Sequence, residues 1–428
     1  MPTGQARFGV IASGASSAVH VAGWHRAFAS RRDRTLRLVD ATTFAVAVPP
    51  PHHGGFGWYF VRLETDSGLV GWGETAVLTA LTGHERAYHA LMKSVFERYL
   101  RHRDPMNRDP LNKQLYAALS CHHNDYVAAG IVSAFDIAMW DICGKALGVP
   151  VADLLGGRHR SRIRTYTYMY DLAHPDGLRG SVSNWVGNPR RLAEVARTLV
   201  DEGFTGLKLD PLDYLVPGSV PLQPWEIPPA QYDRAERCIE AVRTAIGSEA
   251  DICIGTHGQT TPAAARRLAR RLEAYDPLWL EEPCPPENVE EMGRVARSTT
   301  IPIATGERLS YVHDFQKLFA VGACAVAQPD LGSCGGLTAA KQIAGMAEAH
   351  YVLMAPHVWG GPVITAAALQ LDAAVPNFLI QESIHTSHGF FDEVVKEPFV
   401  WDAGDLVVDD RPGIGIELDP EKLARYTL

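Results

Sequence analysis

The 428-residue sequence lacks the features that mark several large classes of proteins. It has no uninterrupted run of about 18 apolar residues, so we expect no membrane-spanning helix and no membrane partner. It has no basic excess: 40 Lys and Arg stand against 49 Asp and Glu, and the net charge of -9 disfavours a general nucleic-acid-binding protein. Its seven cysteines form no Cys-x-x-Cys pair, which favours reduced thiols and a cytoplasmic location over a disulfide framework.

The composition is that of an ordinary globular protein, with 46% hydrophobic and 21% charged residues. The length suits one large α/β barrel with an appendage, or two to three smaller domains. Residues 1–35 contain a diluted apolar stretch followed by arginines, which favours an N-terminal extension over a cleaved signal peptide.

The chain changes its pattern near residue 160. Residues 36–75 alternate like strands with turns between them, and residues 84–155 carry apolar residues at helical spacing. A block of strands followed by a block of helices predicts an α+β domain, which we assign to residues 36–160.

Short apolar runs alternate with amphipathic helical stretches after residue 160. Buried parallel strands joined by helices have this pattern, and repeated βα units close into a barrel. We expect a barrel over residues 161–395 and a C-terminal segment, 396–428, that returns to the first domain. The expected strands are 206–209, 251–255, 278–280, 301–304, 325–328, 352–355 and 378–380.

An acidic or histidine side chain, of the kind that can bind a metal ion or transfer a proton, follows the end of each apolar run. From the second of them onward, these residues are spaced by 23 to 27 positions, about the length of one βα unit. In a barrel they would share the C-terminal mouth, where active sites form. The residues are Asp210, His257, Glu281, Glu307, Asp330, His357 and Glu382.

Several short motifs, in this order and spacing, resemble the enolase superfamily, specifically its mandelate racemase-like branch and the sugar-acid dehydratases within it. The resemblance covers about residues 36–420. It implies a modified TIM barrel, (β/α)7β, under an N-terminal α+β capping domain, with a divalent metal, usually Mg²⁺. The matching stretches are 61–74, Asp136-Ile-Ala-Met-Trp-Asp141, 144–148, Glu281-Glu-Pro283, Gly306-Glu-Arg308, Gln328-Pro-Asp330, Gly335-Gly336, Ala355-Pro-His357 and Gln381-Glu382.

The resemblance implies that Glu281 and Glu307 are metal ligands. The family's first ligand lies two residues before the histidine of an Asp-x-His motif, and this chain has Gly255 there. Asp210 follows the preceding strand, so we expect it to supply the missing carboxylate. The alternative is that Asp210 is a loop acid and the metal site is weaker or absent.

The resemblance also implies a His357–Asp330 dyad that removes the proton α to the substrate carboxylate. His257 matches a histidine that protonates the departing β-hydroxyl, or else hydrogen-bonds a substrate hydroxyl. The resemblance implies that Glu382 supports the enediolate. It also implies that the positive charge of Lys208 offsets the negative charge of a carboxylate. Trp58 belongs to a strand beside a Pro/Gly loop that we expect to cover the substrate, and we expect Trp58 to contact the substrate there.

Together these features predict a Mg²⁺-dependent dehydratase of a polyhydroxy sugar acid, a small-molecule substrate, in a homo-oligomeric enzyme. Two alternatives stay open. One is epimerisation or lactone cycloisomerisation through the same enediolate. The other is a sugar-acid-binding protein that lost its metal with the change at Gly255.

Overall fold

The computed structural model describes residues 36–50, 52–77, 81–120, 123–169, 188–212, 226–408 and 410–428. The predicted extension, 1–35, lies outside the described residues. Most of the long segment 211–230 does as well.

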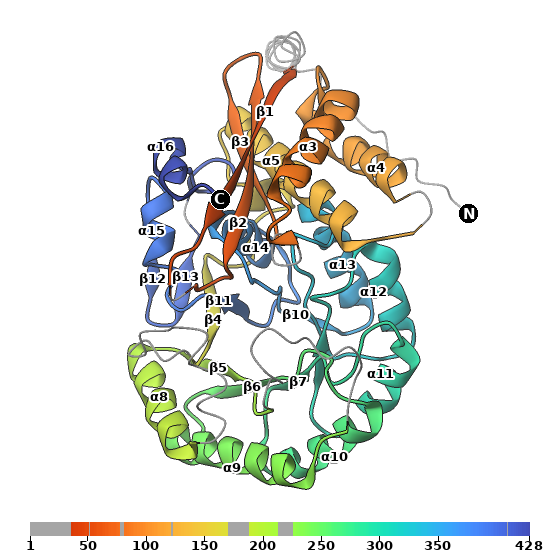
Figure 1. The fold of residues 1–428 in the computed structure, drawn as a ribbon, viewed down its shortest axis with the longest axis vertical. Coiled ribbons are helices and arrows are strands. Elements are labelled where there is room, and N and C mark those ends of the chain that lie inside the picture. Colours follow the sequence, from red (N-terminus) through yellow and green to blue (C-terminus); the bar gives the residue numbers. More distant parts are fainter. Residues whose placement is uncertain are drawn as a thin grey trace, which may run out of the picture.

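The N-terminal part forms an antiparallel sheet covered by helices, at the top of Figure 1. The sheet order is β1-β2-β3, and the backbone N–H of Gly68 donates to the carbonyl of Thr65 in the turn before β3. The elements are β1 (Leu38–Ala47), β2 (Gly57–Thr65), β3 (Val70–Thr75), α3 (Glu85–Val95), a π-helical turn (Phe96–Leu100), a 3-10 turn (Pro105–Asn107), α4 (Arg108–Leu119), α5 (Tyr126–Leu147) and α6 (Val151–Leu154).

Helix α5 is the core helix of this capping domain. The Asp125 carboxylate accepts a hydrogen bond from the backbone N–H of Ala128 at its start, and Gly148 ends it with φ of 69°. Among the described helices it alone is long and apolar enough to cross a membrane, yet 94% of its apolar window is buried inside the fold. Its hydrophobicity is therefore explained by packing between the sheet and the second domain.

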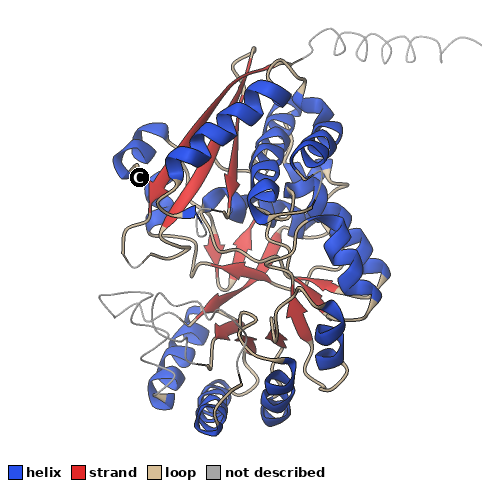
Figure 2. Ribbon diagram, turned by 45° about the vertical axis from the view of Figure 1, so that its right-hand side comes forward, coloured by secondary structure: helices blue, strands red, loops and turns tan. Residues whose placement is uncertain are grey.

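The second part is a parallel sheet surrounded by helices, in the lower half of Figures 1 and 2. Its strand order follows the chain from β4 to β10, and β11 pairs in parallel with β4. The elements are β4 (Arg162–Tyr168), α8 (Pro189–Glu202), β5 (Gly206–Leu209), α9 (Pro229–Ile246), β6 (Asp251–Gly255), α10 (Pro262–Leu272), a 3-10 turn (Glu273–Tyr275), β7 (Trp279–Glu281), α11 (Val289–Ala296), β8 (Ile303–Thr305), α12 (Tyr311–Ala320), β9 (Val326–Ala327), α13 (Gly336–Ala349), β10 (Leu353–Met354), α14 (Pro362–Ala374) and β11 (Gln381–Ser383).

These strands enclose a small core of their own. It takes single residues from successive strands or their ends, as the interior layers of a barrel do. Hydrogen bonds of Met354 with Asn377 and Leu379 also join β10 to the segment that leads into β11. The predicted α/β class with a parallel sheet and a capping domain is thus confirmed. The core residues are Tyr166, Cys253, Trp279, Ala304, Val326, Ala355 and Ile380.

One predicted strand was misplaced. The sequence predicted the last strand at 378–380, with Glu382 after it, but β11 spans Gln381–Ser383 and contains Glu382. Phe378 instead forms an isolated bridge to Met354. The apolar run therefore contacts β10 first, and pairing with β4 begins only at Gln381.

The C-terminal segment contacts both domains. It contains α15 (Phe390–Val394), β12 (Trp401–Asp402), β13 (Asp405–Val407), α16 (Pro420–Leu423) and a 3-10 turn (Ala424–Tyr426). The backbone N–H of Leu428 donates to Ala45 in β1, and β13 pairs with β4. The buried Asp141 carboxylate of α5 accepts from the backbone N–H groups of Trp72 and Ile414.

Glu74 at the end of β3 holds the capping domain on the parallel-sheet domain. Its carboxylate accepts backbone N–H bonds from Gly361, Val363 and Ile364, at the start of α14, at 2.5, 3.0 and 2.9 Å. An acceptor at a helix N-terminus satisfies donors that the helix cannot. Burial nevertheless raises the pKa of Glu74 to about 8.

Removing this carboxylate should loosen the contact between the domains. Because buried donors lose their acceptor, Glu74→Ala is expected to lower the free energy of unfolding by about 3 kcal/mol. Chemical denaturation would measure it, with the part-exposed Glu64→Ala as a control expected to change little. Since the folded pKa is raised, the contribution of Glu74 declines as the pH rises from about 4.5 to 8, and Glu74→Gln should remove that decline. A Glu74→Ala protein as stable as the control would contradict this role.

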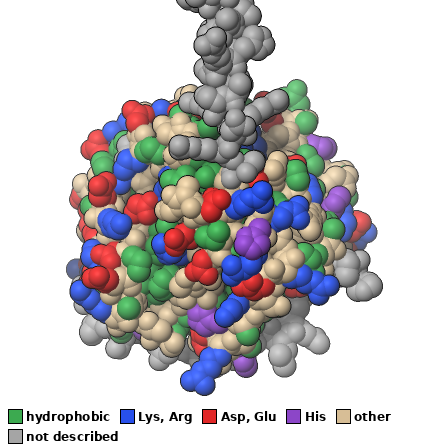
Figure 3. All heavy atoms as spheres, turned by 90° about the horizontal axis from the view of Figure 1, so that it is seen from above, with side chains coloured by type: hydrophobic (Ala, Val, Ile, Leu, Met, Phe, Trp, Pro, Cys, Tyr) green, Lys and Arg blue, Asp and Glu red, His purple; other side chains and the backbone are tan. Residues whose placement is uncertain are grey.

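On the face seen from above, acidic and basic side chains are interspersed (Figure 3). Neither sign of charge forms a continuous field among the residues drawn in colour there.

Candidate active site

The structure places the predicted polar residues at one end of the parallel sheet. Glu281 and Glu382 are within β7 and β11, and the others follow β5, β6, β8, β9 and β10 by one to three residues. Because parallel strands end at the same edge, their side chains gather at the C-terminal mouth.

Lys208 of β5 lies at the centre of a buried charge network. Its ammonium group donates to Glu281 Oε1 at 2.5 Å and to Glu382 Oε1 at 3.1 Å, and all three side chains are about 1% exposed. Burial opposes the charge of Lys208, but the two carboxylates outweigh it and raise the lysine pKa well above its usual value. Lys208 is thus a fixed cation that holds two acids in place.

Glu281 is oriented by three donors. Trp279 Nε1 and Gln328 Nε2 donate to its Oε2 at 3.0 and 2.8 Å, and Lys208 donates to its Oε1. Burial raises the pKa of Glu281. Among the described residues Oε1 has one hydrogen-bond donor, so one of its lone pairs is left for another ligand.

Glu307 is held ionised by its surroundings. Burial opposes its negative charge, but His357, His257 and Lys208 outweigh burial and lower the pKa of Glu307 to about 2. Its Oε2 lies 3.6 Å from His357 Nε2 and, among the described residues, is buried without a hydrogen-bond partner.

The neighbouring Glu282 supports the site from behind. Its carboxylate accepts from Thr305 Oγ1 and from Arg308 Nε, the latter at 2.9 Å. Glu282 also has a left-handed backbone, with φ of 47°. A non-glycine residue in this region is uncommon and is often found at functional sites.

His357 and Asp330 form the predicted dyad. His357 Nδ1 lies 2.7 Å from Asp330 Oδ2, and Asp330 Oδ1 accepts from the backbone N–H of Gly332 at 2.7 Å. The aspartate therefore fixes the proton on Nδ1 and leaves Nε2 facing the site.

Nε2 of His357 faces two carboxylates. It lies 3.6 Å from Glu307 Oε2 and 3.8 Å from Glu382 Oε2, and Glu382 Oε2 also accepts from the backbone N–H of Val358. Burial opposes the imidazolium, but Glu382, Asp330 and Glu307 raise the pKa of His357 to about 10.

A direct check of this environment is the titration of His357 by NMR in metal-free protein. We expect its ring to titrate near pH 10, and Asp330→Asn to lower that pKa, because the hydrogen-bonded anion is lost. The exposed His350 serves as the reference ring. A His357 pKa near 6.5 in the unsubstituted protein would contradict this geometry.

His257 enters the mouth from the end of β6. Its Nδ1 lies 3.6 Å from Asp210 Oδ2, its Nε2 lies 3.2 Å from Tyr168 Oη, and its side chain is 29% exposed. Its φ of 48° is left-handed, and its carbonyl accepts from Arg308 at 3.3 Å. The ring is thus held in place while part of it stays accessible to a substrate.

Tyr168 is a site residue that the sequence did not single out. Tyr166, Tyr168 and Tyr170 alternate along the expected first strand of the barrel, a pattern that favours packing but leaves open that one of them donates a hydrogen bond in the site. The structure buries Tyr166 and brings Tyr168 to His257, with the Lys208 ammonium 4.8 Å from the Tyr168 ring centre. Tyr170 lies outside the described residues.

Asp210 lies at the same edge, with its side chain 5% exposed. Its Oδ1, like Glu307 Oε2, is a buried carboxylate oxygen without a hydrogen-bond partner among the described residues. Within those residues, no three acidic, histidine or cysteine side chains form a ready-made metal cage. The site instead offers two unsatisfied carboxylate oxygens and one part-satisfied carboxylate, Glu281.

Trp58 is buried in the capping domain. It is 1% exposed, its indole N–H donates to the Gly54 carbonyl at 3.1 Å, and its ring packs against Phe390 and Phe391. These contacts anchor the Pro/Gly loop. A direct contact of Trp58 with substrate stays a prediction.

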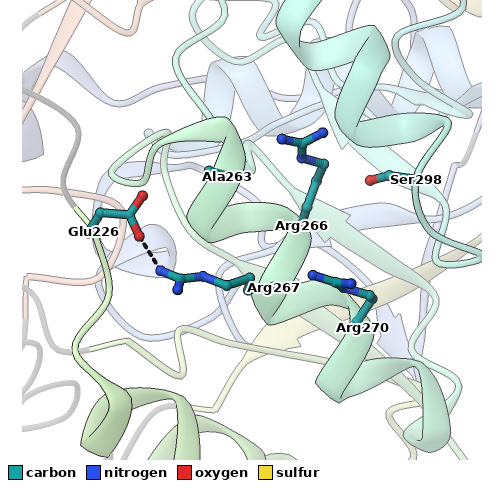
Figure 4. A pocket seen from close by; sticks show the side chains of 6 residues that line it. All are labelled: Glu226, Ala263, Arg266, Arg267, Arg270 and Ser298. Atoms are coloured by element: carbon teal, nitrogen blue, oxygen red, sulfur yellow. Dashed lines mark hydrogen bonds and ion pairs between the residues drawn. The ribbon is translucent and has the colours of Figure 1, made fainter.

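A surface cavity beside α10 is separate from this site. Figure 4 shows its lining residues, and Arg267 pairs with Glu226 at its edge. None of the predicted site residues lines it. The lining residues are Glu226, Ala263, Arg266, Arg267, Arg270 and Ser298.

Two family models match the chain. Residues 40–156 match the mandelate racemase / muconate lactonizing enzyme N-terminal domain, and residues 191–422 match the enolase C-terminal domain-like family. Several relatives are named D-galactonate dehydratase, among them one from Verminephrobacter eiseniae and one from Pectobacterium atrosepticum. The one from Verminephrobacter eiseniae is 34% identical over 90% of this chain and 92% of its own. The one from Pectobacterium atrosepticum is 33% identical over 90% of this chain and 93% of its own.

Solved structures agree with the family models. A mandelate racemase/muconate lactonizing enzyme from Sulfitobacter sp. is 36% identical, has a TM-score of 0.85, and is matched over 92% of this chain and 96% of its own. Another from Jannaschia sp. CCS1 is also 36% identical with a TM-score of 0.85, over 92% and 98%. The chain therefore belongs to the mandelate racemase/muconate lactonizing enzyme family of the enolase superfamily.

Proposed function

We propose that this protein is a Mg²⁺-dependent sugar-acid dehydratase, a hydro-lyase that converts an aldonic or aldaric acid to a 2-keto-3-deoxy acid. The observation that carries the proposal is the pair of histidines, His357 and His257, at the ends of two strands that flank the carboxylates Glu281 and Glu307. Relatives named D-galactonate dehydratase, which are similar to this chain over most of its length, support the proposal. D-galactonate is accordingly the first substrate to test.

Dehydration needs a base and an acid at different carbons of the substrate. His357 Nε2 takes the proton from the carbon next to the substrate carboxylate, while Asp330 keeps the other ring nitrogen protonated and stabilises the imidazolium. The electron pair left on that carbon then forms the double bond to the β-carbon as the β-hydroxyl departs.

Hydroxide leaves poorly without a proton. His257 donates that proton, so that the β-oxygen departs as water and the organic product is an enol. The enol gains a proton at the former β-carbon and loses its hydroxyl proton, which gives the 2-keto-3-deoxy acid. Tyr168, at 3.2 Å from His257 Nε2, positions the ring for this donation.

The donor set fits magnesium. Mg²⁺ prefers hard oxygen ligands, is usually bound through one or two carboxylates, and keeps several waters. Glu281, Glu307 and Asp210 would hold it, since two of them have unsatisfied buried oxygens. When bound, the ion would coordinate the substrate carboxylate and stabilise the negative charge of the enediolate. It would also offset the negative charge of the carboxylates that raise the pKa of His357.

Lys208 and Glu382 complete the electrostatics around the enediolate. Lys208 keeps a positive charge between Glu281 and Glu382, and all three side chains are buried. Glu382 is fixed by Lys208 and by the backbone N–H of Val358, and its Oε2 lies 3.8 Å from His357 Nε2. From there its negative charge supports the imidazolium that forms when His357 removes the α-proton to give the enediolate. In a low-dielectric site such fixed charges act strongly.

We place the enzyme in the cytoplasm as a homo-oligomer. The six described cysteines are all buried and none of them is in a disulfide, which suits a reducing compartment. Homo-oligomerisation rests on the family resemblance.

The proposal is tested by incubating the purified protein with Mg²⁺ and a panel of aldonic and aldaric acids that includes D-galactonate. Formation of a 2-keto acid, detected as its semicarbazone and abolished by EDTA, is the expected result. Exchange or inversion at the α-carbon without keto acid would instead indicate an epimerase. Binding of a sugar acid without any turnover would indicate a binding protein.

A further inference from the structure

We propose that this chain carries one metal-binding carboxylate on β5, as Asp210, in place of an acid at position 255 on the neighbouring strand β6, which is glycine. We call this the exchange between Asp210 and Gly255. β5, through Asp210, supplies the metal-binding carboxylate that fills the space above β6, and residue 255 is glycine because any side chain there would occupy the same space. The inference rests on the proposed function for the presence of a bound cation, but it concerns where the chain carries one ligand.

The first observation is steric. β5 and β6 are parallel, with Leu209 opposite Ile254, so Asp210 and Gly255 are adjacent at the strand ends. A Cβ on Gly255 would lie 2.1 Å from Asp210 Oδ1 and 3.4 Å from its Cγ. Real Cβ contacts are essentially never under 3.0 Å, so a side chain at 255 would force the Asp210 carboxylate to shift out of its present position.

The second observation is an unsatisfied charge. Asp210 Oδ1, the atom above Gly255, is buried and has no hydrogen-bond partner among the described residues. Leaving such a group unpaired costs roughly 1–3 kcal/mol, and more for a charged group. An unpaired carboxylate oxygen at the C-terminal mouth of the sheet therefore lowers stability. Its presence is explained if Oδ1 of Asp210 binds a metal ion in the functional protein.

The two oxygens of Asp210 face different neighbours. Oδ2 lies 3.6 Å from His257 Nδ1, whereas Oδ1 lies above Gly255. Glu307, from β8, contributes the other unsatisfied carboxylate oxygen of the site. These oxygens are hard donors of the type that Mg²⁺ and Mn²⁺ bind.

The rival explanation is that Asp210 only orients His257. The two explanations differ for Asp210→Asn, which keeps the size of the side chain and an oxygen near the imidazole but removes the negative charge. If Asp210 only orients His257, this substitution should leave the affinity for metal unchanged. If Asp210 is a metal ligand, the substitution should weaken metal binding.

The test measures metal affinity without substrate. Isothermal titration of the full-length, metal-free protein with Mg²⁺, and with Mn²⁺ followed by its EPR signal, gives the dissociation constants. We expect Asp210→Asn and Asp210→Ala to weaken binding by more than about 100-fold, beyond the loss of about 10- to 100-fold that is typical of residues that only support ligands. Melting temperatures in EDTA show whether each variant is folded. A folded Asp210→Asn protein that binds metal like the unsubstituted protein overturns the inference.

The exchange itself is tested by moving the carboxylate. Gly255→Asp alone should bind metal poorly or fold poorly because of the collision with Asp210. The double variant Asp210→Gly/Gly255→Asp should bind metal at least tenfold more tightly than Asp210→Gly. A folded double variant that binds no better than Asp210→Gly overturns the exchange.

The outcomes for ligand and function are separable. Keto-acid formation by a protein whose Asp210→Asn variant binds metal normally would refute the inference and keep the function. Normal metal binding that depends on Asp210, without turnover of any sugar acid, would refute the function and keep the inference.

Discussion

Replacing His357 with asparagine is expected to lower the rate of keto-acid formation by about 10²–10⁴-fold, the usual contribution of a general base. The variant should also stop exchange of the substrate α-proton with solvent D₂O, because Nε2 of His357 is the group that removes it. Asparagine still offers a polar group to Asp330, so the fold should be preserved. Steady-state kinetics and ¹H NMR in D₂O measure the two effects.

The matched control is His350→Asn, at an exposed position after α13. It should leave both rates unchanged. A His357→Asn protein that still exchanges the α-proton at the unsubstituted rate would show that another group is the base, and would remove the central residue of the mechanism.

Replacing His257 with asparagine is expected to separate two steps that His357→Asn abolishes together. Keto-acid formation should fall by about 10²–10⁴-fold, because the departing hydroxyl loses its proton donor. The α-proton should still exchange with D₂O, since the His357–Asp330 dyad is intact and can return a deuteron to the same carbon.

His313→Asn, at an exposed position of α12, is the control for this substitution. The opposite pattern would be informative. If His257→Asn slowed exchange and dehydration equally, His257 would belong to the first step, as an opposed acid or base does in an epimerase.

Periodicity predicted most of the fold because each βα unit repeats the same pattern. The regular spacing of His257, Glu281 and Glu307 follows from one strand and one helix per unit, so their shared edge was predictable. The start of β11 was missed, since residues 378–380 are apolar for a different reason: the chain passes along β10 before it reaches β4.

The finer arrangement of the site depends on contacts between distant segments, which spacing cannot encode. Tyr168 and Tyr166 look equivalent in the sequence, but only the former lies near His257. The collision between Asp210 and a side chain at Gly255 likewise requires coordinates. The sequence signal was limited to the glycine where a ligand was expected and the acid on the preceding strand.

The most direct test of the account is one reaction in D₂O, with Mg²⁺ and D-galactonate or the best substrate of the panel, followed by NMR. The account predicts a 2-keto-3-deoxy acid that carries one solvent deuterium at C3, because the α-proton leaves with His357, the β-hydroxyl leaves as water, and the enol is protonated from solvent. Recovery of substrate with deuterium or inversion at C2, and no keto acid, would contradict dehydration and establish epimerase chemistry on the same dyad.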